Sequence, residues 1–314
     1  SITVVLFLTA ITIELSGLLK FNPVYMILPE IFCANLGGAA TMSGDPPNII
    51  IGTSLGLTFM DFLTNTGIII LIALIAMIIY FYLCFAKKLK EGSHMADSSA
   101  MPDPSSAISN RLGFMISTMI FLMVVFLLVT HAQTGITVAS IGIIAAVLTL
   151  VTSVDVKGGL LRGIDWKTIY FFVGLFVVVG GLEQTHILDL LADLISRASG
   201  GHVMVMVCVI LWFSALASAI IDNIPFAATM VPVIKALAIT QGIPVETLAW
   251  TLALGTDIGG NATPIGASAN VVGTSIASRN GHHITWGQYC RYALPATILC
   301  LVICTVMLYI LHVR

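Results

Sequence analysis

Two stretches of the chain decide its fold, because they repeat one another. Residues 35–54 read NLGGAATMSGDPPNIIIGTS, and residues 257–275 read DIGGNATPIGASANVVGTS. Gly37 and Gly259 are 222 positions apart, and the same separation relates four further pairs: Gly38/Gly260, Thr41/Thr263, Gly44/Gly266 and Asn48/Asn270. The GTS that closes each stretch matches after a gap of one residue. The sequence therefore predicts an internal repeat.

The composition indicates that the solvent of this chain is lipid. Apolar residues make up 58% of the 314 residues and charged residues only 9%, against roughly 25% charged residues in a soluble domain. At about 20 apolar residues per crossing, the length allows roughly eight to eleven membrane-inserted elements. The formal net charge of -2 offers no basic surface to a nucleic acid. We expect an all-α, multi-pass integral membrane protein in a lipid bilayer, with no nucleic-acid partner.

Positive charges give the expected orientation. Residues 59–65, 131–135 and 241–246 contain no Lys or Arg, whereas the alternate connections carry Lys20, Lys87, Lys88, Lys90, Lys157, Arg162, Lys167, Arg279 and Arg291. The positive-inside rule then places loop 87–111 in the cytoplasm and the C-terminus outside, in a plasma (inner) membrane. The first stretch runs from inside to outside and the second from outside to inside. Such inverted-topology repeats are typical of secondary transporters.

The expected domain organisation follows from the repeat. Residues 1–90 form a first repeat with the second half of a hairpin, a broken helix and a span, and 91–111 form a polar cytoplasmic linker. Residues 112–314 form the second repeat: scaffold spans over 112–183, an interfacial helix at 185–199, a re-entrant hairpin at 203–240, a broken helix at 246–278 and a last span at 289–312. Because Ser1 aligns with Asn223, we expect the N-terminal helices and the front half of the first hairpin to be missing.

Each repeat interrupts an apolar helix with Gly-Gly and small polar residues. Lipid cannot pair the backbone groups that an interruption frees, so they must face protein or a water-filled cavity. Broken helices of this kind bind substrate and coupling ions in secondary transporters, whereas packing through small residues is the alternative. We expect the two breaks to meet at mid-membrane, with Asn48 near Asn270, related by a pseudo-two-fold axis in the membrane plane.

The candidate ligands lie at the breaks and at the tip of the hairpin. They are Asn35, Thr41, Ser43, Asp45, Asn48, Asp222, Asn223, Asp257, Asn261, Thr263, Ser268 and Asn270. Their oxygens and amides suit a dehydrated sodium ion or an oxyanion, and sodium is expected near Gly37, Gly38, Asn223, Gly259, Gly260 and Asn261. Helix capping alone is the alternative for Asp45 and Asp222. We expect Asn223→Ala and Asn270→Ala to abolish transport with little loss of expression.

Asp257 and Asp222 are the candidate carriers of the coupling ion. A buried carboxylate is costly when charged, so it tends to be protonated or paired with a cation. Na+ or H+ is therefore the expected coupling ion, and no other cofactor is expected. Because Asn35 stands at the position that matches Asp257, Asp257→Asn should keep the fold and remove the coupling.

Three segments resemble a known family: GDPPNIIIG at 44–52, IIDNIPFAATMVP at 220–232 and GGNATPIGASANVVG at 259–273. They are similar to the ion transporter superfamily, in the branch of arsenite-pump-like permeases, sodium/proton antiporters and the melanosomal P protein, which shares a citrate-transporter-like domain. The resemblance implies re-entrant hairpins, broken helices, a homodimer of scaffold domains and an elevator-like movement. The sequence departs from it in the incomplete first hairpin and in the extra carboxylate of Asp257.

Several functions fit these observations. The leading hypothesis is a secondary active transporter that couples a small ionic substrate, above all an anion (a dicarboxylate, citrate or an arsenite-like ion), to a Na+ or H+ gradient. The alternatives are a Na+/H+ antiporter and a passive anion channel. An enzyme is disfavoured, because the sequence has no nucleophile–base motif, Walker loop or HExxH. ATP-driven transport by this chain alone is disfavoured for the same reason, and a separate ATPase partner stays open.

Overall fold

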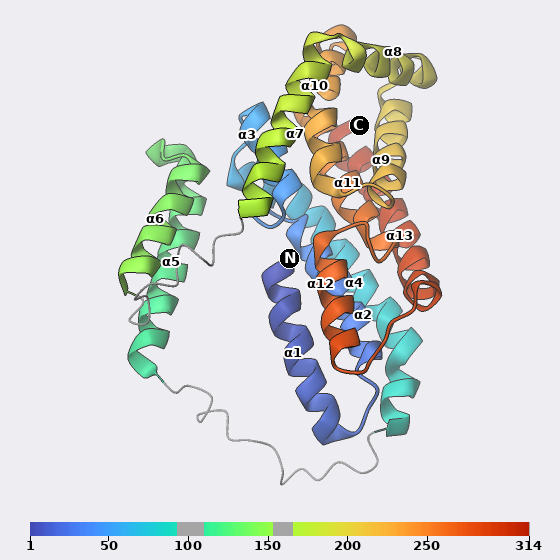
Figure 1. Cartoon of the computed structure of the whole chain (residues 1–314). Helices are drawn as coiled ribbons and strands as arrows, with labels where there is room; N and C mark the ends of the chain where they lie inside the picture. The colour runs from blue at the N-terminus through green and yellow to red at the C-terminus, as the bar shows by residue number, and fades with distance from the viewer. Residues whose placement is uncertain (93–109, 153–165, 314) are drawn as a thin grey trace.

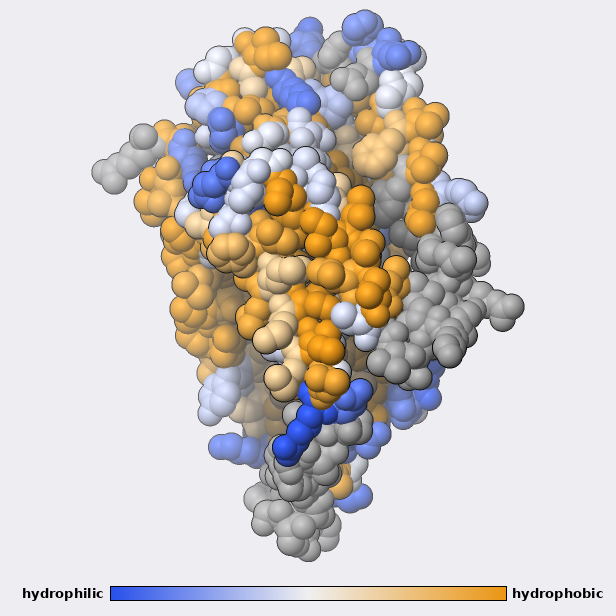
Figure 2. Space-filling view, turned by 90° about the vertical axis from the view of Figure 1, so that its left-hand side faces the viewer, coloured by the Kyte–Doolittle hydropathy of each residue, from blue (hydrophilic) through white to orange (hydrophobic). Residues whose placement is uncertain are grey.

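The computed structural model of the chain describes residues 1–92, 110–152 and 166–313. These residues form helices and connections, with no strand among them. Within these ranges, five helices are long and apolar enough to cross a membrane: Ile2–Leu19, Phe59–Lys90, Arg111–Thr134, Asn223–Gln241 and Trp286–Val313. Hydrophobic residues gather over the middle of the molecule and hydrophilic residues at its two ends (Figure 2). The fold is that of an all-α polytopic membrane protein, as expected.

The first repeat contains the break that the sequence predicted. Helices α1 (Ile2–Leu19) and α2 (Val24–Gly38) are followed by α3 (Pro46–Leu55) and the long helix α4 (Phe59–Gly92). Helix α2 ends at the Gly-Gly pair, and α3 begins at Pro46. Proline suits a first helical position because its missing N–H would have no intrahelical partner there.

The second repeat has the same order of elements. Helices α9 (Val203–Ser218) and α10 (Asn223–Gln241) form the expected hairpin, followed by α11 (Val245–Gly259), a 3-10 turn at Gly260–Ala262 and α12 (Ser268–Arg279). The last helix, α13 (Trp286–Leu308), continues into a π-helical turn at Tyr309–Val313. Asp222 caps α10 by accepting a hydrogen bond from the backbone N–H of Ile224 at 3.0 Å. With 19 residues, α10 is also long enough to cross a membrane.

The two repeats exchange their packing partners. At a separation of 222 positions, α1, α2, α3 and α4 correspond to α10, α11, α12 and α13. Helix α1 packs against α12, and the matching helix α10 packs against α3; likewise α2 packs against α12, and α11 against α3. Figure 1 shows α1, α2 and α12 towards one end of the molecule and α3, α10 and α11 towards the other. A two-fold relation between the repeats would produce such an exchange of packing partners.

The remaining helices lie outside this repeated core. Helices α5 (Arg111–Thr134) and α6 (Val138–Thr152) form a hairpin that stands beside the main bundle (Figure 1). Helix α5 has no buried residue, and Ile141 is the buried residue of α6. Helix α7 (Trp166–Gln184) leads to α8 (Ile187–Ser199), which lies across one end of the bundle (Figure 1).

Helix α8 is amphipathic, as its sequence indicated. Leu188, Ala192 and Ile195 are buried, and the helix packs against α9 and α10. An ion pair between Asp193 and Arg197, with an N···O distance of 2.8 Å, lies on the exposed side. Most of the expected linker 91–111 lies outside the described residues, and so do Lys157 and Arg162.

Candidate ion and substrate site

One asparagine clamps the break in each repeat. The side-chain amide of Asn48 donates to the carbonyl oxygens of Gly38 and Thr41, both at 3.3 Å. Its repeat partner Asn270 donates to the carbonyl oxygens of Gly260 and Thr263, both at 2.8 Å. These carbonyls lie where the helix ends and have lost their helical partners. The matched asparagines therefore satisfy, from within the protein, backbone groups that lipid could not satisfy.

Close backbone contacts explain the second pair of matched glycines. A Cβ atom on Gly44 would overlap the carbonyl oxygen of Gly38, and a Cβ on Gly266 would overlap that of Gly260. The loop that leaves each break thus returns against the backbone of the helix end. Glycine is required there for space, and the repeat of this contact explains the repeat of the motif.

The two breaks meet through cross-pairs. The amide of Asn35, at the end of α2, donates to the side-chain oxygens of Asn261 at 2.9 Å and Asn270 at 2.7 Å. Exchanging the repeats turns the pair Asn35–Asn270 into the pair Asp257–Asn48. The Asn48 amide does lie beside the carboxyl group of Asp257. The contacts between the breaks are thus Asn35 with Asn270 and Asn48 with Asp257. The expected nearness of Asn48 to Asn270 and the pseudo-two-fold axis stay predictions.

Three buried side chains at the two breaks carry unpaired oxygen atoms. The side chains of Asn35, Asn48 and Asp257 are 2%, 0% and 1% exposed. Among the residues described, Oδ1 of Asn35, Oδ1 of Asn48 and both carboxylate oxygens of Asp257 have no hydrogen-bond partner. The Asn48 amide and the Asp45 carboxyl are close enough to interact with Asp257, but neither reaches it with the geometry of a hydrogen bond.

This set of oxygens has a clear chemical preference. Leaving buried acceptors unpaired costs roughly 1–3 kcal/mol for each group, and more when the group is charged. A proton on Asp257, or a cation between the oxygens, would remove that cost. Carboxylate and amide oxygens are also the ligands that hard cations take. The arrangement is therefore suited to H+ or to a small hard cation such as Na+.

The tip of the α9–α10 hairpin contacts the first break. The amide of Asn223 donates to Oδ2 of Asp45 at 3.0 Å, and the hydroxyl of Ser1 donates to Oδ1 of Asp45 at 2.6 Å. Asp222 is close enough for its carboxyl to interact with that of Asp45. Asp45 stands at the N-cap position of α3, but its side chain makes no capping hydrogen bond. Of the two expected caps, only that of Asp222 forms.

Three helix N-termini line one small cavity. Pro46 begins α3, Asn223 begins α10 and Ser268 begins α12, and all three line a cavity of about 10 Å³ together with Asp45. That volume holds about one water molecule. The positive ends of helix dipoles and free backbone N–H groups favour an anion at such a place. The cavity thus combines a preference for anions with a neighbouring carboxylate.

The other predicted ligands have different surroundings. Ser43 is exposed, and Thr41 contributes its carbonyl oxygen. The hydroxyl of Thr263 donates to the carbonyl oxygen of Ala219 at 2.5 Å, which ties the second break to the α9–α10 connection. Asn261 accepts from Asn35, and its own amide nitrogen is unpaired among the residues described.

The glycines expected near sodium differ in their surroundings. A Cβ on Gly259 would overlap the backbone of Ala215 in α9, and a Cβ on Gly255 would lie 2.8 Å from the carbonyl oxygen of Leu211. These glycines seat α11 against α9, whereas Gly37 has no atom within 4 Å of the corresponding position. Packing through small residues, the alternative that the sequence left open, therefore holds at Gly259, and the GxxxG spacing of Gly255 and Gly259 is a known signal for such contacts.

An all-α membrane bundle with two crossed helix breaks, and with polar side chains buried where they cross, defines a membrane transporter. Residues 1–255 match the model of the citrate transporter family, and the chain belongs to that family. An uncharacterized transporter of Mycobacterium tuberculosis is 36% identical over 313 residues, which cover 99% of this chain and 72% of the relative. This assignment makes the protein a multi-pass membrane transporter and not an enzyme.

Two further relatives extend this comparison. A 46 kDa membrane protein of Mycobacterium leprae is 32% identical over 317 residues, covering 99% of this chain and 73% of the relative. The human P protein is 28% identical over 394 residues, covering 99% of this chain and 46% of the relative. The branch of transporters that the motifs resemble is therefore confirmed.

Proposed function

We propose that this protein is a secondary active transporter that moves a small anion, in first place citrate or a dicarboxylate, together with Na+ or H+. The family supports citrate as the first substrate to test. The observation that carries the proposal is the buried group of unpaired oxygens on Asn35, Asn48 and Asp257. Among the described residues these oxygens take part in no hydrogen bond of the fold, and they are suited to the ion that drives transport.

The coupling of anion binding to the binding of Na+ or H+ would come from the charges of the neighbouring carboxyl groups. Asp45 lies at the cavity where the three helix N-termini meet, and it interacts with the buried Asp257. Two carboxylates that are close together at low dielectric cannot both stay charged without a cation. An anion beside Asp45 adds a further negative charge. Binding of Na+ or H+ therefore promotes binding of the anion, which makes the transport a symport.

Movement of the core completes this proposal. A cavity of about 10 Å³ cannot hold citrate, so α3, α10 and α12 must separate when the substrate enters. The exchange of contacts between the repeats supports inverted repeats, in which such a movement opens the site to either side. The exposed hairpin α5–α6 is the proposed scaffold and homodimer contact. We place loop 87–111 in the cytoplasm and the C-terminus outside, in the plasma membrane.

A Na+/H+ antiporter is the second candidate, and one observation favours it. Asp45 interacts electrostatically with Asp222 as well as with Asp257. A carboxyl group inside a membrane whose charge is opposed by two others can exchange a proton for a sodium ion. A passive anion channel would need neither the carboxyl groups nor a gradient of a second ion.

The test is uptake by the full-length protein in proteoliposomes. Labelled citrate, succinate and arsenite are offered with an imposed Na+ gradient, an imposed pH gradient or neither. We expect saturable uptake of a carboxylate that one of the gradients increases several-fold. Sodium-driven proton movement that needs no anion would replace the proposal by antiport. Flux that does not saturate and ignores both gradients would replace it by a channel.

A further inference from the structure

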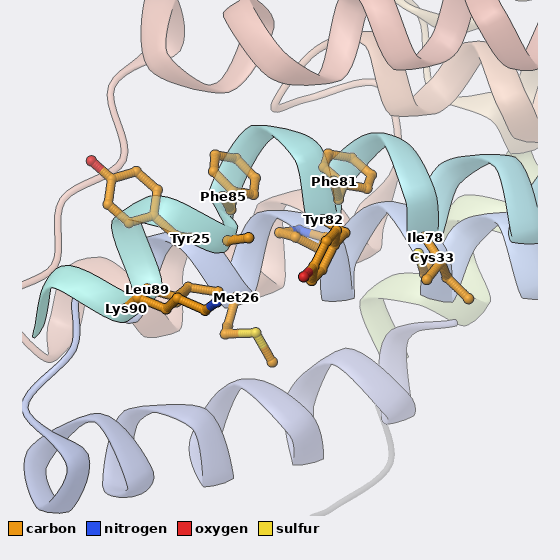
Figure 3. A pocket seen from close by; sticks show the side chains of 11 residues that line it. Tyr25, Met26, Cys33, Ile78, Phe81, Tyr82, Phe85, Leu89 and Lys90 are labelled. Carbon is orange, nitrogen blue, oxygen red and sulfur yellow. The ribbon is translucent and has the colours of Figure 1, made fainter. Parts of the chain in front are cut away.

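An apolar groove opens on the surface of the bundle between α2 and α4. Its volume is about 390 Å³, and Met26, Pro29, Cys33, Ile78 and Leu89 are among the residues that line it. Figure 3 shows the rings of Tyr25, Phe85, Phe81 and Tyr82 arranged along the groove, with Lys90 at one end and Ile78 and Cys33 at the other. Met26 is 39% exposed and Tyr82 is 64% exposed, so the groove is accessible from the side of the bundle.

A second cavity of about 360 Å³ adjoins the groove. Tyr25 lines both cavities, and the second one is completed by Lys88, Gly287, Gln288, Arg291 and Tyr292. The Lys88 ammonium lies 4.8 Å from the centre of the Tyr25 ring and 5.0 Å from that of Tyr292. It also donates a hydrogen bond of 2.5 Å to the Tyr292 hydroxyl. These contacts hold the cation at the boundary between the apolar and the polar cavity.

The second cavity has an excess of positive charge. Lys88 and Arg291 are close enough to repel one another. Within the part of the chain that the structure describes, neither side chain forms an ion pair with a carboxylate. Two cations that share a cavity without a counter-charge are stabilised by an anion, and guanidinium and ammonium groups are the usual ligands of phosphate.

We propose that the two cavities together bind one anionic phospholipid, with an acyl chain in the groove and the phosphate between Lys88 and Arg291. The apolar and basic cavities meet at Tyr25, so an acyl chain and the phosphate to which it is linked could occupy them side by side. They also lie at the end of α4 that carries Lys87, Lys88 and Lys90, where the headgroups of anionic lipids are expected. Basic pockets between membrane helices bind such headgroups. A soluble anion would occupy only the basic cavity.

The test measures lipid binding to the purified full chain and is independent of transport. The protein in detergent is titrated with phosphatidylglycerol or phosphatidylcholine, and bound lipid is counted by native mass spectrometry. We expect phosphatidylglycerol to bind the more tightly, and Lys88→Gln and Arg291→Gln each to weaken its binding about fivefold. Lys20→Gln is the matched control, because Lys20 is an exposed cation that lines neither cavity.

A second variant tests the groove itself. Ile78 is 56% exposed, so Ile78→Trp fills the groove without entering the core, and unfolding curves check that each variant is folded. We expect this variant to weaken phosphatidylglycerol binding while the binding of glycerol 3-phosphate stays unchanged. Equal affinity for the two lipids would overturn the proposal. Unchanged binding in both charge variants would overturn it too, and so would competition by glycerol 3-phosphate at the affinity of the lipid.

Discussion

Asn270 has two roles that cannot be separated at this position. Its amide holds the carbonyl oxygens of Gly260 and Thr263, and its oxygen accepts from Asn35 of the other repeat. The sequence treated it as a ligand whose loss would affect transport alone. The structure shows that it also closes the break and joins the repeats, so we expect Asn270→Ala to lower stability as well as transport.

We predict that Asn270→Ala destabilises the protein by about 1.5 to 4.5 kcal/mol, since each of three hydrogen bonds contributes roughly 0.5–1.5 kcal/mol. Asn48→Ala is the matched variant, and it should lose less, because Asn48 makes two longer bonds and its oxygen is unpaired. The free energy of unfolding in detergent is the measurement. An Asn270→Ala protein as stable as the wild type, or a greater loss in Asn48→Ala, would show that the clamp is not structural.

The sequence predicted the members of this site better than their contacts. The sequence indicates four members of the site, because polar side chains at a helix break inside a membrane must face protein or a water-filled cavity. They are Asn35, Asn48, Asp257 and Asn270. Their pairing depends on where each one lies relative to the two-fold axis, which a separation of 222 positions along the chain does not reveal. The unpaired oxygens could not be predicted either, because they depend on which donors the fold brings near.

At the scale of elements, the sequence predicted the positions of the helix breaks because glycine and proline residues at the breaks determine where the helices end and begin. Helix α2 ends at Gly37-Gly38 and α3 begins at Pro46, while α11 ends at Gly259-Gly260. Each of these boundaries lies at or within two residues of the expected position. Packing through small residues was the alternative to ion binding at Gly259, but the sequence did not indicate that the partner would be α9. The partner depends on the tertiary arrangement of the helices and not on local chemistry.

We expect Gly259→Ala to separate α9 from α11, because its Cβ would overlap the backbone of Ala215. Overpacking of this kind costs about 1–3 kcal/mol. Gly37→Ala is the control at the matching position of the first repeat, where the new methyl group meets no atom within 4 Å. Unfolding of both variants in detergent is compared with the wild type, and equal losses would contradict the packing role of Gly259.

At the scale of the whole molecule, the exchange of contacts and the distribution of charge support one orientation. Helices α4 and α13 are matched elements, and the end of α4 lies beside the start of α13, where Lys88 and Arg291 share a cavity. This meeting of the end of one matched helix with the start of the other fits the proposed inverted repeats, in which matched helices run in opposite directions. The positive-inside rule would then place this end in the cytoplasm.

This orientation can be measured by cysteine labelling in a variant without native cysteines. Gln133, at the end of α5, and Lys87, near the end of α4, are both exposed. We predict that Gln133→Cys reacts with a membrane-impermeant thiol reagent in intact cells, and that Lys87→Cys reacts only after permeabilisation. The reverse pattern would invert the topology, and labelling of both in intact cells would argue against a single orientation.

The central claim is that the buried oxygens at the crossing of the two breaks bind the ion that drives transport. The most direct test is uptake by Asp257→Asn in proteoliposomes, with the transported anion, under Na+ and pH gradients. Asn35 stands at the matching position, and neither oxygen of Asp257 has a hydrogen bond to lose, so the variant should fold with the stability of the wild type. If Asp257 binds the coupling ion, the uptake by this variant is the same with and without the gradient. Uptake that keeps the gradient dependence of the wild type would contradict the claim.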